Sequence, residues 1–356
     1  MNHVAQPPRH PVWRIGLFVF ITIAGLFYVK WSPYYDRAFI AANTQSIGLP
    51  IVASNDGTIP APSLSAALNY AVAYGLAIWK ALLLGLLVGS GLNALLSANW
   101  IQKILGARNM GSVIVGSLLS VPSMMCTCCA APVVNGLRQC QAAPGSTVAY
   151  WLGNTMLNPA TLVFMGFVLG WHWVGFRLAI GLVMVIGLGW VLNRISDDTQ
   201  TATVPGLHVP LATQQHRHLS AFTVMQRWGR SFVGMAIRLL PEYLVLVLLL
   251  GAARAWLFPM LDMNVDNTVL WIGAAAIAGL LFVIPTAGEV PIAQTMLMAG
   301  GAVGPVAALL VTLPPVSLPS LTMVARSFQR THMVILIGGV LAIGILAGFL
   351  AVALGF

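Results

Sequence analysis

Charged residues are scarce in this chain, and their scarcity excludes several classes of protein. Only 7% of the 356 residues are Asp, Glu, Lys or Arg, whereas 58% are hydrophobic and the mean hydropathy is +0.88. Soluble domains carry about 25% charged residues, so the composition excludes a soluble enzyme, a nucleic-acid-binding domain and a disordered scaffold. The sequence predicts an all-α polytopic membrane protein of the cell inner (plasma) membrane.

Acidic residues are fewer still, with eight Asp and Glu against 17 Lys and Arg. In a soluble protein the net charge of +9 would indicate nucleic acid. Here the basic residues mostly flank apolar runs, where they report orientation, and no nucleic-acid partner is expected. Arg9 and Arg14 precede the first apolar run, so the N-terminus is predicted to be cytoplasmic.

The chain also lacks the motifs of common enzyme chemistry. It contains no phosphate-binding loop, no G-x-S-x-G and no H-E-x-x-H. ATP-driven transport by this chain alone and the common hydrolase mechanisms therefore have no support. We expect no cofactor and no enzymatic activity.

Apolar runs and polar connectors divide the chain into four segments. The first, 1–65, combines a retained transmembrane helix at about 15–31 with an external loop. A first repeat at 66–192 and a second at 231–356 flank a basic, cytoplasmic connector at 193–230. Together the apolar stretches predict about 8–10 transmembrane helices.

An internal repeat is indicated by an ordered series of prolines and glycines. The offset between the copies is 159 to 163 residues, and the matched pairs are Pro122 and Pro285, Pro132 and Pro291, Gly145 and Gly304, and Pro159 and Pro319. The connector at 98–110 carries Lys103 and Arg108, whereas its counterpart at 257–269 carries two Asp. By the positive-inside rule these connectors face opposite sides, which predicts inverted-topology repeats.

Proline within membrane-depth sequence frees backbone amides and carbonyls that lipid cannot satisfy. The segments 122–145 and 285–305 are therefore predicted to be broken or re-entrant helices that face protein or a watery cavity. In inverted-repeat transporters such paired segments form the substrate site near the bilayer midplane. The predicted structural pivots are Pro122, Pro132, Pro285 and Pro291.

Cysteines are few and confined to one place. Cys126, Cys128, Cys129 and Cys140 lie within 15 residues, unlike the spread of a secreted disulfide framework. Thiolates are soft ligands suited to soft metals and metalloids, so the first three are predicted to bind substrate. The alternative is that they are small buried apolar side chains. A zinc site is less favoured, since no histidine lies in the segment, and no particular metal is assigned.

Two acidic residues fall inside apolar sequence. Glu289 occupies the place in the second copy that the cysteines hold in the first, and we expect it to carry protons. The alternative is an ion pair with Arg238 or Lys80. Glu242 is expected to pair with Arg238, four residues earlier on the same helix.

Polar amides in apolar context complete the expected site. Asn135, Asn158 and Gln294 are predicted to contact substrate, and hydrogen bonding between helices is the alternative for each. Asn158 precedes Pro159, a pair that can place an amide in a cavity.

The run 122–162 resembles the core of the predicted permease family that contains the ArsP-type organoarsenical exporters and the YraQ-type permeases. That family shows a proline, C-x-C-G, a second proline, a G-[VA]-P turn and an N-P pair. The matching residues here are Pro122, Cys126, Cys128, Pro132 and Asn158–Pro159, with Cys129 at the family's glycine and Ala143–Pro144–Gly145 at its turn. The second copy, IPTAGEVP…LPPVSLPSL, also resembles the family, and the resemblance covers about 70–356.

These observations lead to one function hypothesis and two alternatives. The hypothesis is a secondary transporter that exports a soft metal, a metalloid or organoarsenical, or a sulfur-containing small solute, with proton coupling through Glu289. The alternatives are a membrane thiol/disulfide oxidoreductase that uses the Cys126–Cys129 cluster, and a passive channel. The expected partners are the small-molecule or metalloid substrate and the lipid bilayer, and the sequence leaves a homo-oligomer open.

Overall fold

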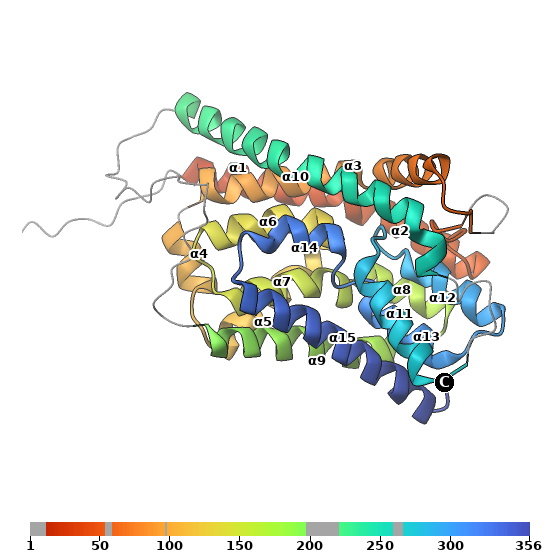
Figure 1. The fold of residues 1–356 in the computed structure, drawn as a ribbon. Coiled ribbons are helices and arrows are strands. Elements are labelled where there is room, and N and C mark those ends of the chain that lie inside the picture. Colours follow the sequence, from red (N-terminus) through yellow and green to blue (C-terminus); the bar gives the residue numbers. More distant parts are fainter. Residues whose placement is uncertain (1–11, 54–58, 97, 197–220, 259–265) are drawn as a thin grey trace, which may run out of the picture.

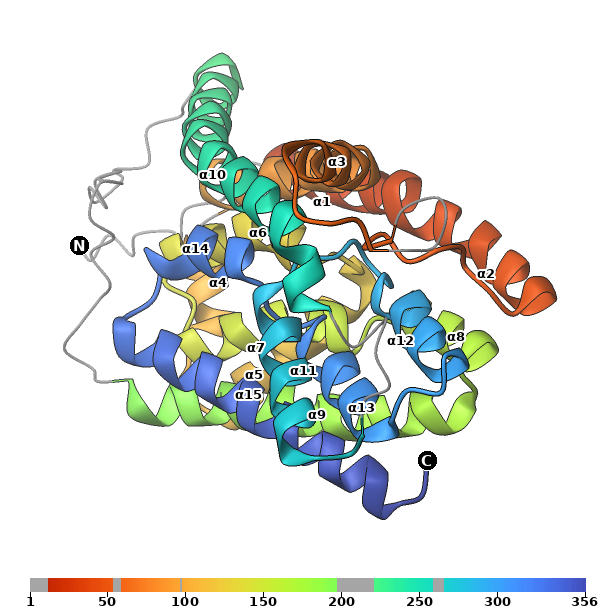
Figure 2. The same cartoon turned by 45° about the vertical axis from the view of Figure 1, so that its right-hand side comes forward.

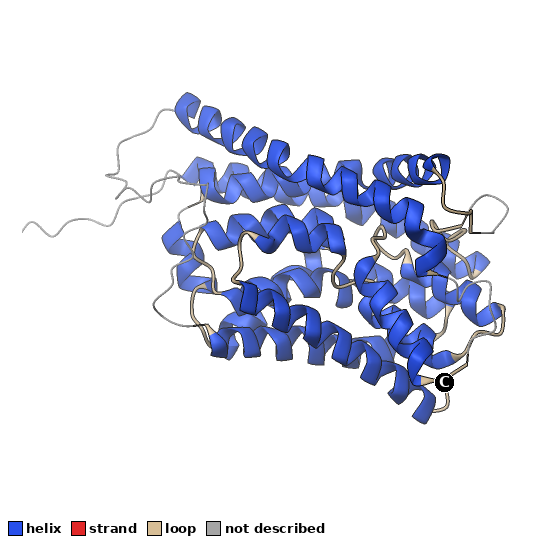
Figure 3. Cartoon of the chain, viewed as in Figure 1, coloured by secondary structure: helices blue, strands red, loops and turns tan. Residues whose placement is uncertain are grey.

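Helices make up all regular structure in the described part of the chain. The computed structural model describes residues 12–53, 59–96, 98–196, 221–258 and 266–356. Within these residues every regular element is a helix (Figure 3), which confirms the all-α class. Some residues on which the predicted orientation of the chain depends lie outside the described residues. They are Arg9, Asp262 and most of the 193–230 connector.

The N-terminal helix is longer than the sequence indicates. Its parts are α1 (Val12–Leu26), a π-helical turn (Phe27–Trp31) and α2 (Ser32–Thr44). The external loop expected from residue 32 is therefore wrong for its first 13 residues. Proline ends many α-helices because its ring clashes with the carbonyl four residues earlier, and Pro33 lies within this N-terminal helix. The wider π-helical turn, in which the amide of Ser32 donates to the carbonyl of Phe27, accommodates it.

Long apolar helices form the outer parts of the molecule. By length and composition five candidate spans occur in the described residues: Trp13–Thr44, α3 (Leu64–Leu95), α9 (Trp171–Ile195), α10 (Ala221–Leu257) and α15 (Arg330–Ala353). A sixth is formed if α4 (Ala98–Leu105) and the following helix, bent by 111°, count as one broken span. The total of 8–10 stays a prediction. α10 begins inside the segment assigned to the connector, whose last ten residues were expected to be polar loop.

Short helices form the two broken stretches. In the first half they are α5 (Met110–Ser120), a 3-10 turn (Val121–Ser123), α6 (Thr127–Gln139), α7 (Pro144–Met156) and α8 (Pro159–Val168). In the second half they are α11 (Val269–Leu281), α12 (Glu289–Met298), α13 (Val303–Thr312) and α14 (Leu318–Ala325). Both stretches are interrupted at Pro122 and Pro285, whereas α6 and α12 continue through the other two predicted pivots, Pro132 and Pro291.

The short helices lie between two layers of long helices. α3 and α10 run along one side of the molecule, and α9 and α15 run along the opposite side (Figure 1 and Figure 2). α5, α7 and α9 pack against one another, and so do α11, α13 and α15. α6 packs on α14, and α8 packs on α12. Two short helices of the first half thus contact two short helices of the second half.

The two helix breaks share an unusual backbone feature. Met124 has φ +46° and Ala287 has φ +67°, and each lies two residues after a proline of the repeat, Pro122 or Pro285. A left-handed conformation at a residue other than glycine costs about 1–2 kcal/mol. The surrounding packing therefore holds both breaks in a conformation that the residues alone disfavour.

Close backbone approach joins α3 to α6. A Cβ atom added at Gly89 would lie 2.3 Å from the carbonyl oxygen of Pro132, and one added at Gly85 would meet the carbonyl of Cys129. The spacing Gly85-x-x-x-Gly89 is typical of tightly packed membrane helices. The first turn of α6, which carries the cysteines, is thereby held against α3.

We predict that Gly89→Val destabilises the protein by about 1–3 kcal/mol, because a side chain there overpacks the interface of α3 with α6. Gly75→Val is the matched control, since Gly75 lies on the same helix with open space around it. The apparent Tm and the size-exclusion profile in detergent measure the effect. Equal melting of the two variants would contradict this account of the interface.

Candidate functional site

A narrow pocket lies between the second helix break and the first half of the chain. Its cavity volume is about 10 Å³, room for about one water molecule, and the space that includes its opening is about 260 Å³. The lining side chains come from the start of α6, the end of α7, the start of α8, the break itself and the end of α13: Cys126, Thr127, Thr155, Thr161, Ile284, Pro285, Thr286, Ala287, Glu289, Leu313 and Pro314. The pocket therefore lies between the two broken segments and is lined by both halves.

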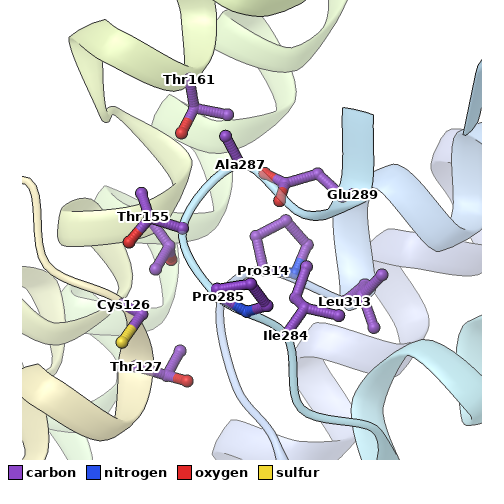
Figure 4. A pocket seen from close by; sticks show the side chains of 11 residues that line it. Cys126, Thr127, Thr155, Thr161, Ile284, Pro285, Ala287, Glu289, Leu313 and Pro314 are labelled. Carbon is purple, nitrogen blue, oxygen red and sulfur yellow. The ribbon is translucent and has the colours of Figure 1, made fainter. Parts of the chain in front are cut away.

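The segment 284–288, here called the break loop, runs through this site. Cys126 and Thr155 lie on one side of the loop, and Glu289 and Leu313 lie on the other (Figure 4). The predicted thiol and carboxylate groups thus line one pocket but do not face each other directly. Any movement of the break loop changes both sides together.

Cys126 and Cys129 form the thiol side. Cys126 immediately precedes α6 and Cys129 lies in its first turn, with 2.8 Å between their sulfur atoms. Their spacing is C-x-x-C at a helix N-terminus. Cys128 points elsewhere, toward Tyr74 at 3.9 Å and Ser317 at 3.8 Å.

The remaining cysteine lies apart from this site. Cys140 follows α6 and donates to the Asn93 side chain at 2.9 Å. Among the described residues, no three His, Cys, Asp or Glu side chains converge as they would around a metal ion.

Glu289 forms a buried ion pair with Arg177. The Arg177 Nη1 to Glu289 Oε1 distance is 2.7 Å, and the two side chains are 2% and 3% exposed. Arg177 Nη2 also donates to the backbone carbonyl of Thr155, a pocket residue, at 2.8 Å. Arg177 comes from α9 and Glu289 from the start of α12, so the pair joins the two halves. The expected alternative partners, Arg238 and Lys80, are wrong.

The other membrane-depth charges also have partners that the sequence did not indicate. Glu242 pairs with Arg326 at 2.5 Å, on an exposed surface, instead of with Arg238. Arg326 follows the last residue of α14, and the packing of α10 on α14 brings it close to Glu242. Glu242 therefore pairs with this distant arginine although Arg238 lies only four residues away on its own helix. Lys80 is exposed and lies over the rings of Tyr28 and Trp79.

Lys30 does not line the pocket but contacts its lining through Thr286, a contact that the sequence did not predict. It is buried, and its ammonium group donates to the Tyr34 hydroxyl at 3.2 Å and to the Thr286 hydroxyl of the break loop at 3.1 Å. Its position near the end of an apolar run indicated an interfacial lysine. The π-helical turn is what directs it inward, and that turn has no clear sequence signal.

The predicted amides serve the packing of the helices. Asn135 donates to the carbonyl of Met323 at 3.0 Å, which joins α6 to α14. Asn158 precedes α8 and accepts from the first amides of that helix. Gln294 donates to the carbonyl of Gln45, the residue that ends α2, at 2.9 Å. None of the three lines the pocket, so their contact with substrate stays a prediction.

The four predicted pivots divide into two kinds. Pro122 and Pro285 lie in the breaks themselves, and Pro285 also lines the pocket. Pro132 lies inside α6, and Pro291 lies in the first turn of α12. The first pair interrupts helices, whereas α6 and α12 continue past the second pair.

The fold and this site define a multi-pass membrane protein with a buried polar site between broken helices. Residues 63–352 match the family model ArsP_1, described as a predicted permease, and the chain belongs to this family. It is 46% identical over 340 residues to UPF0718 protein YraQ of Escherichia coli, which covers 95% of each chain. These matches confirm the resemblance found in the sequence.

The chain also matches a more distant relative. The chain is 22% identical over 335 residues to UPF0718 protein MJ0584 of Methanocaldococcus jannaschii, which covers 76% of this chain and 90% of the relative. No solved structure matches the chain with significance.

We predict that Glu289→Gln lowers the apparent Tm strongly, because it leaves Arg177 as an uncompensated buried charge, which typically costs about 3–5 kcal/mol. Arg177→Met combined with Glu289→Gln should recover part of this loss, since no charge is then left unpaired. Glu242→Gln is the control and should leave the Tm nearly unchanged, because its ion pair is exposed. If Glu289→Gln melts like the parent protein, the buried pair does not support the fold.

Proposed function

We propose that this permease is a proton-coupled secondary transporter of a small solute. The observation that carries the proposal is the pocket lined by Cys126 and Glu289, with the Glu289–Arg177 ion pair buried at its edge. Ionisable groups at membrane depth are costly and commonly mark substrate or proton pathways. Membership of a permease family favours transport over enzymatic chemistry.

Inverted-topology repeats give this transporter its two states. Support comes from the two matched sets of three helices and from the contacts of α6 with α14 and of α8 with α12. The prolines pair α6 with α12 and α8 with α14, so these two contacts are the same contact with the halves exchanged. Such symmetry allows a site to open alternately to each side of the membrane. The short broken helices then supply the crossings beyond the five long ones, and the N-terminus lies in the cytoplasm.

Proton coupling depends on whether the Glu289 carboxylate is paired with Arg177. In the empty site the Glu289 carboxylate neutralises this guanidinium. When solute binding moves the break loop, the pair separates and an unpaired carboxylate in a desolvated site takes up a proton. Solute and proton are then carried together. Arg177 is the ionisable group in contact with Glu289 among the described residues, and Cys126 lines the same pocket on the other side of the break loop.

The thiol side sets the class of solute. Cys126 and Cys129 present two soft sulfur atoms next to the pocket, which suits a metalloid, an organoarsenical or a sulfur-containing solute. A solute that moves together with a proton is driven in the direction of the proton gradient, so this coupling supports uptake where the gradient points inward.

The test is accumulation of methylarsenite and of thiosulfate in proteoliposomes under an imposed pH gradient. With one proton per solute, a gradient of about one pH unit supports about tenfold accumulation. We predict that Glu289→Gln loses this gradient-driven accumulation but keeps downhill exchange, and that Cys126→Ser loses both.

Cys140→Ser is the control for these variants, because Cys140 lies outside the pocket and serine can keep the hydrogen bond to Asn93. Accumulation by Glu289→Gln equal to that of the parent protein would rule out the coupling role. Uptake by the parent that ignores the pH gradient would instead establish a passive channel.

A thiol/disulfide oxidoreductase is the second candidate, favoured by the C-x-x-C spacing of Cys126 and Cys129 at the start of α6. Low-pKa thiols often occupy this place in redox proteins. The two thiols would lose two protons and two electrons to a quinone or to a partner disulfide.

Redox titration with mass-spectrometric thiol labelling separates the two candidates. For a transporter we predict that Cys126 and Cys129 show no turnover with quinone, whatever their equilibrium potential. Steady reoxidation of this pair by quinone, with Cys140 labelled throughout as a thiol, would establish the enzyme.

A further inference from the structure

Lys30 is a buried cation without a counter-charge. It is 4% exposed, and no ion pair involves it within the described part of the chain. Its hydrogen bonds to Tyr34 and Thr286 use two of the three ammonium donors. The Tyr34 ring, 5.1 Å away, supplies some further stabilisation. A buried charge left in this condition is expensive unless a ligand completes its environment.

The turn that carries Lys30 contacts both helix breaks. Lys30 donates to Thr286 in the second break, and its neighbour Trp31 donates from its indole nitrogen to the carbonyl of Pro122 in the first, at 2.8 Å. Further along the same helix, Ala41 packs with Phe164 and with Ala287 of the break loop. The N-terminal helix thus lies against the site, although the family match begins only at residue 63.

The charges around the pocket sum to a positive value. Lys30 and Arg177 are cationic, whereas Glu289 is the one buried carboxylate among the described residues. Glu289 is already paired with Arg177, which leaves the charge of Lys30 uncompensated. α6 and α8 also begin at the pocket, and their N-termini add partial positive charge. A soft metal cation entering here would meet repulsion, whereas an anion would find a partner.

We infer that Lys30 holds the anionic group of the transported solute beside the thiols of Cys126 and Cys129. The inference rests on the proposed transport function and narrows its substrate to a small anion that also carries a soft atom, such as a sulfur oxyanion with a terminal sulfur. Lys30 contacts the break loop through Thr286. An anion that draws the ammonium away from Thr286 therefore frees the loop that precedes Glu289.

The test measures the charge preference of the site through Cys126 itself. Full-length protein in detergent reacts with the anionic sulfonatoethyl methanethiosulfonate or the cationic trimethylammonioethyl methanethiosulfonate, and tandem mass spectrometry assigns the label to Cys126. We expect the anionic reagent to react about tenfold faster, relative to their rates with free thiol, because of the nearby ammonium charge. Lys30→Met should abolish this preference, and Lys30→Arg should restore it.

Lys80→Met is the matched control, since Lys80 is an exposed lysine beside Tyr28 of the same turn. It should keep the full preference. If Lys30→Met fails to give a monodisperse protein, Lys30→Gln replaces it, because its amide can still donate to Thr286.

Three results would overturn the inference: equal rates of the two reagents in the parent protein, an unchanged preference in the neutral Lys30 variant, or a Cys126 that reacts with neither reagent. The labelling needs no transport. Its failure therefore leaves the pH-gradient test of Glu289 intact, and a failure of that test leaves the charge preference standing.

Discussion

The structure depends on one constraint: backbone groups freed at a helix break cannot be left in lipid. Both breaks are enclosed by long helices, α3 and α10 on one side and α9 and α15 on the other (Figure 1). Enclosure in turn demands close packing, which explains the small residues where α3 meets α6. The same enclosure creates a low-dielectric interior in which a few charges have large effects. The site is thus a consequence of how the breaks are buried.

Much of this arrangement could be predicted from the sequence because the relevant signals are local. Apolar runs gave the long helices, and Pro122 and Pro285 gave the breaks. The cysteine cluster and Glu289 stood out because such residues are rare at membrane depth, and one of these cysteines, Cys126, lines the same pocket as Glu289. Each of these signals depends only on residues within one stretch of chain.

The partners of these residues could not be predicted, because they depend on packing between distant segments. Arg177 lies near the start of an apolar helix and Lys30 near the end of one, where basic residues usually reach the membrane interface. In the structure both are buried against the break loop or its continuation. Glu242 is a further example, since it pairs with Arg326 from a distant segment and not with Arg238 on its own helix. The sequence identifies the charged residues at membrane depth, but it does not show which of them form ion pairs in the folded protein.

The break loop is where these long-range contacts combine. Thr286 accepts from Lys30, Ala287 packs against α2, and Glu289 begins α12 while paired with Arg177. Ala287 is held in a left-handed conformation that costs about 1–2 kcal/mol. A segment under such strain returns to an ordinary conformation when its restraints are removed. Loss of the Lys30 contact removes one restraint, and loss of the Arg177 contact removes another. Because both restraints act on the same few residues, the proposed binding of an anion on the thiol side would alter the restraints on Glu289 without any direct contact between the two.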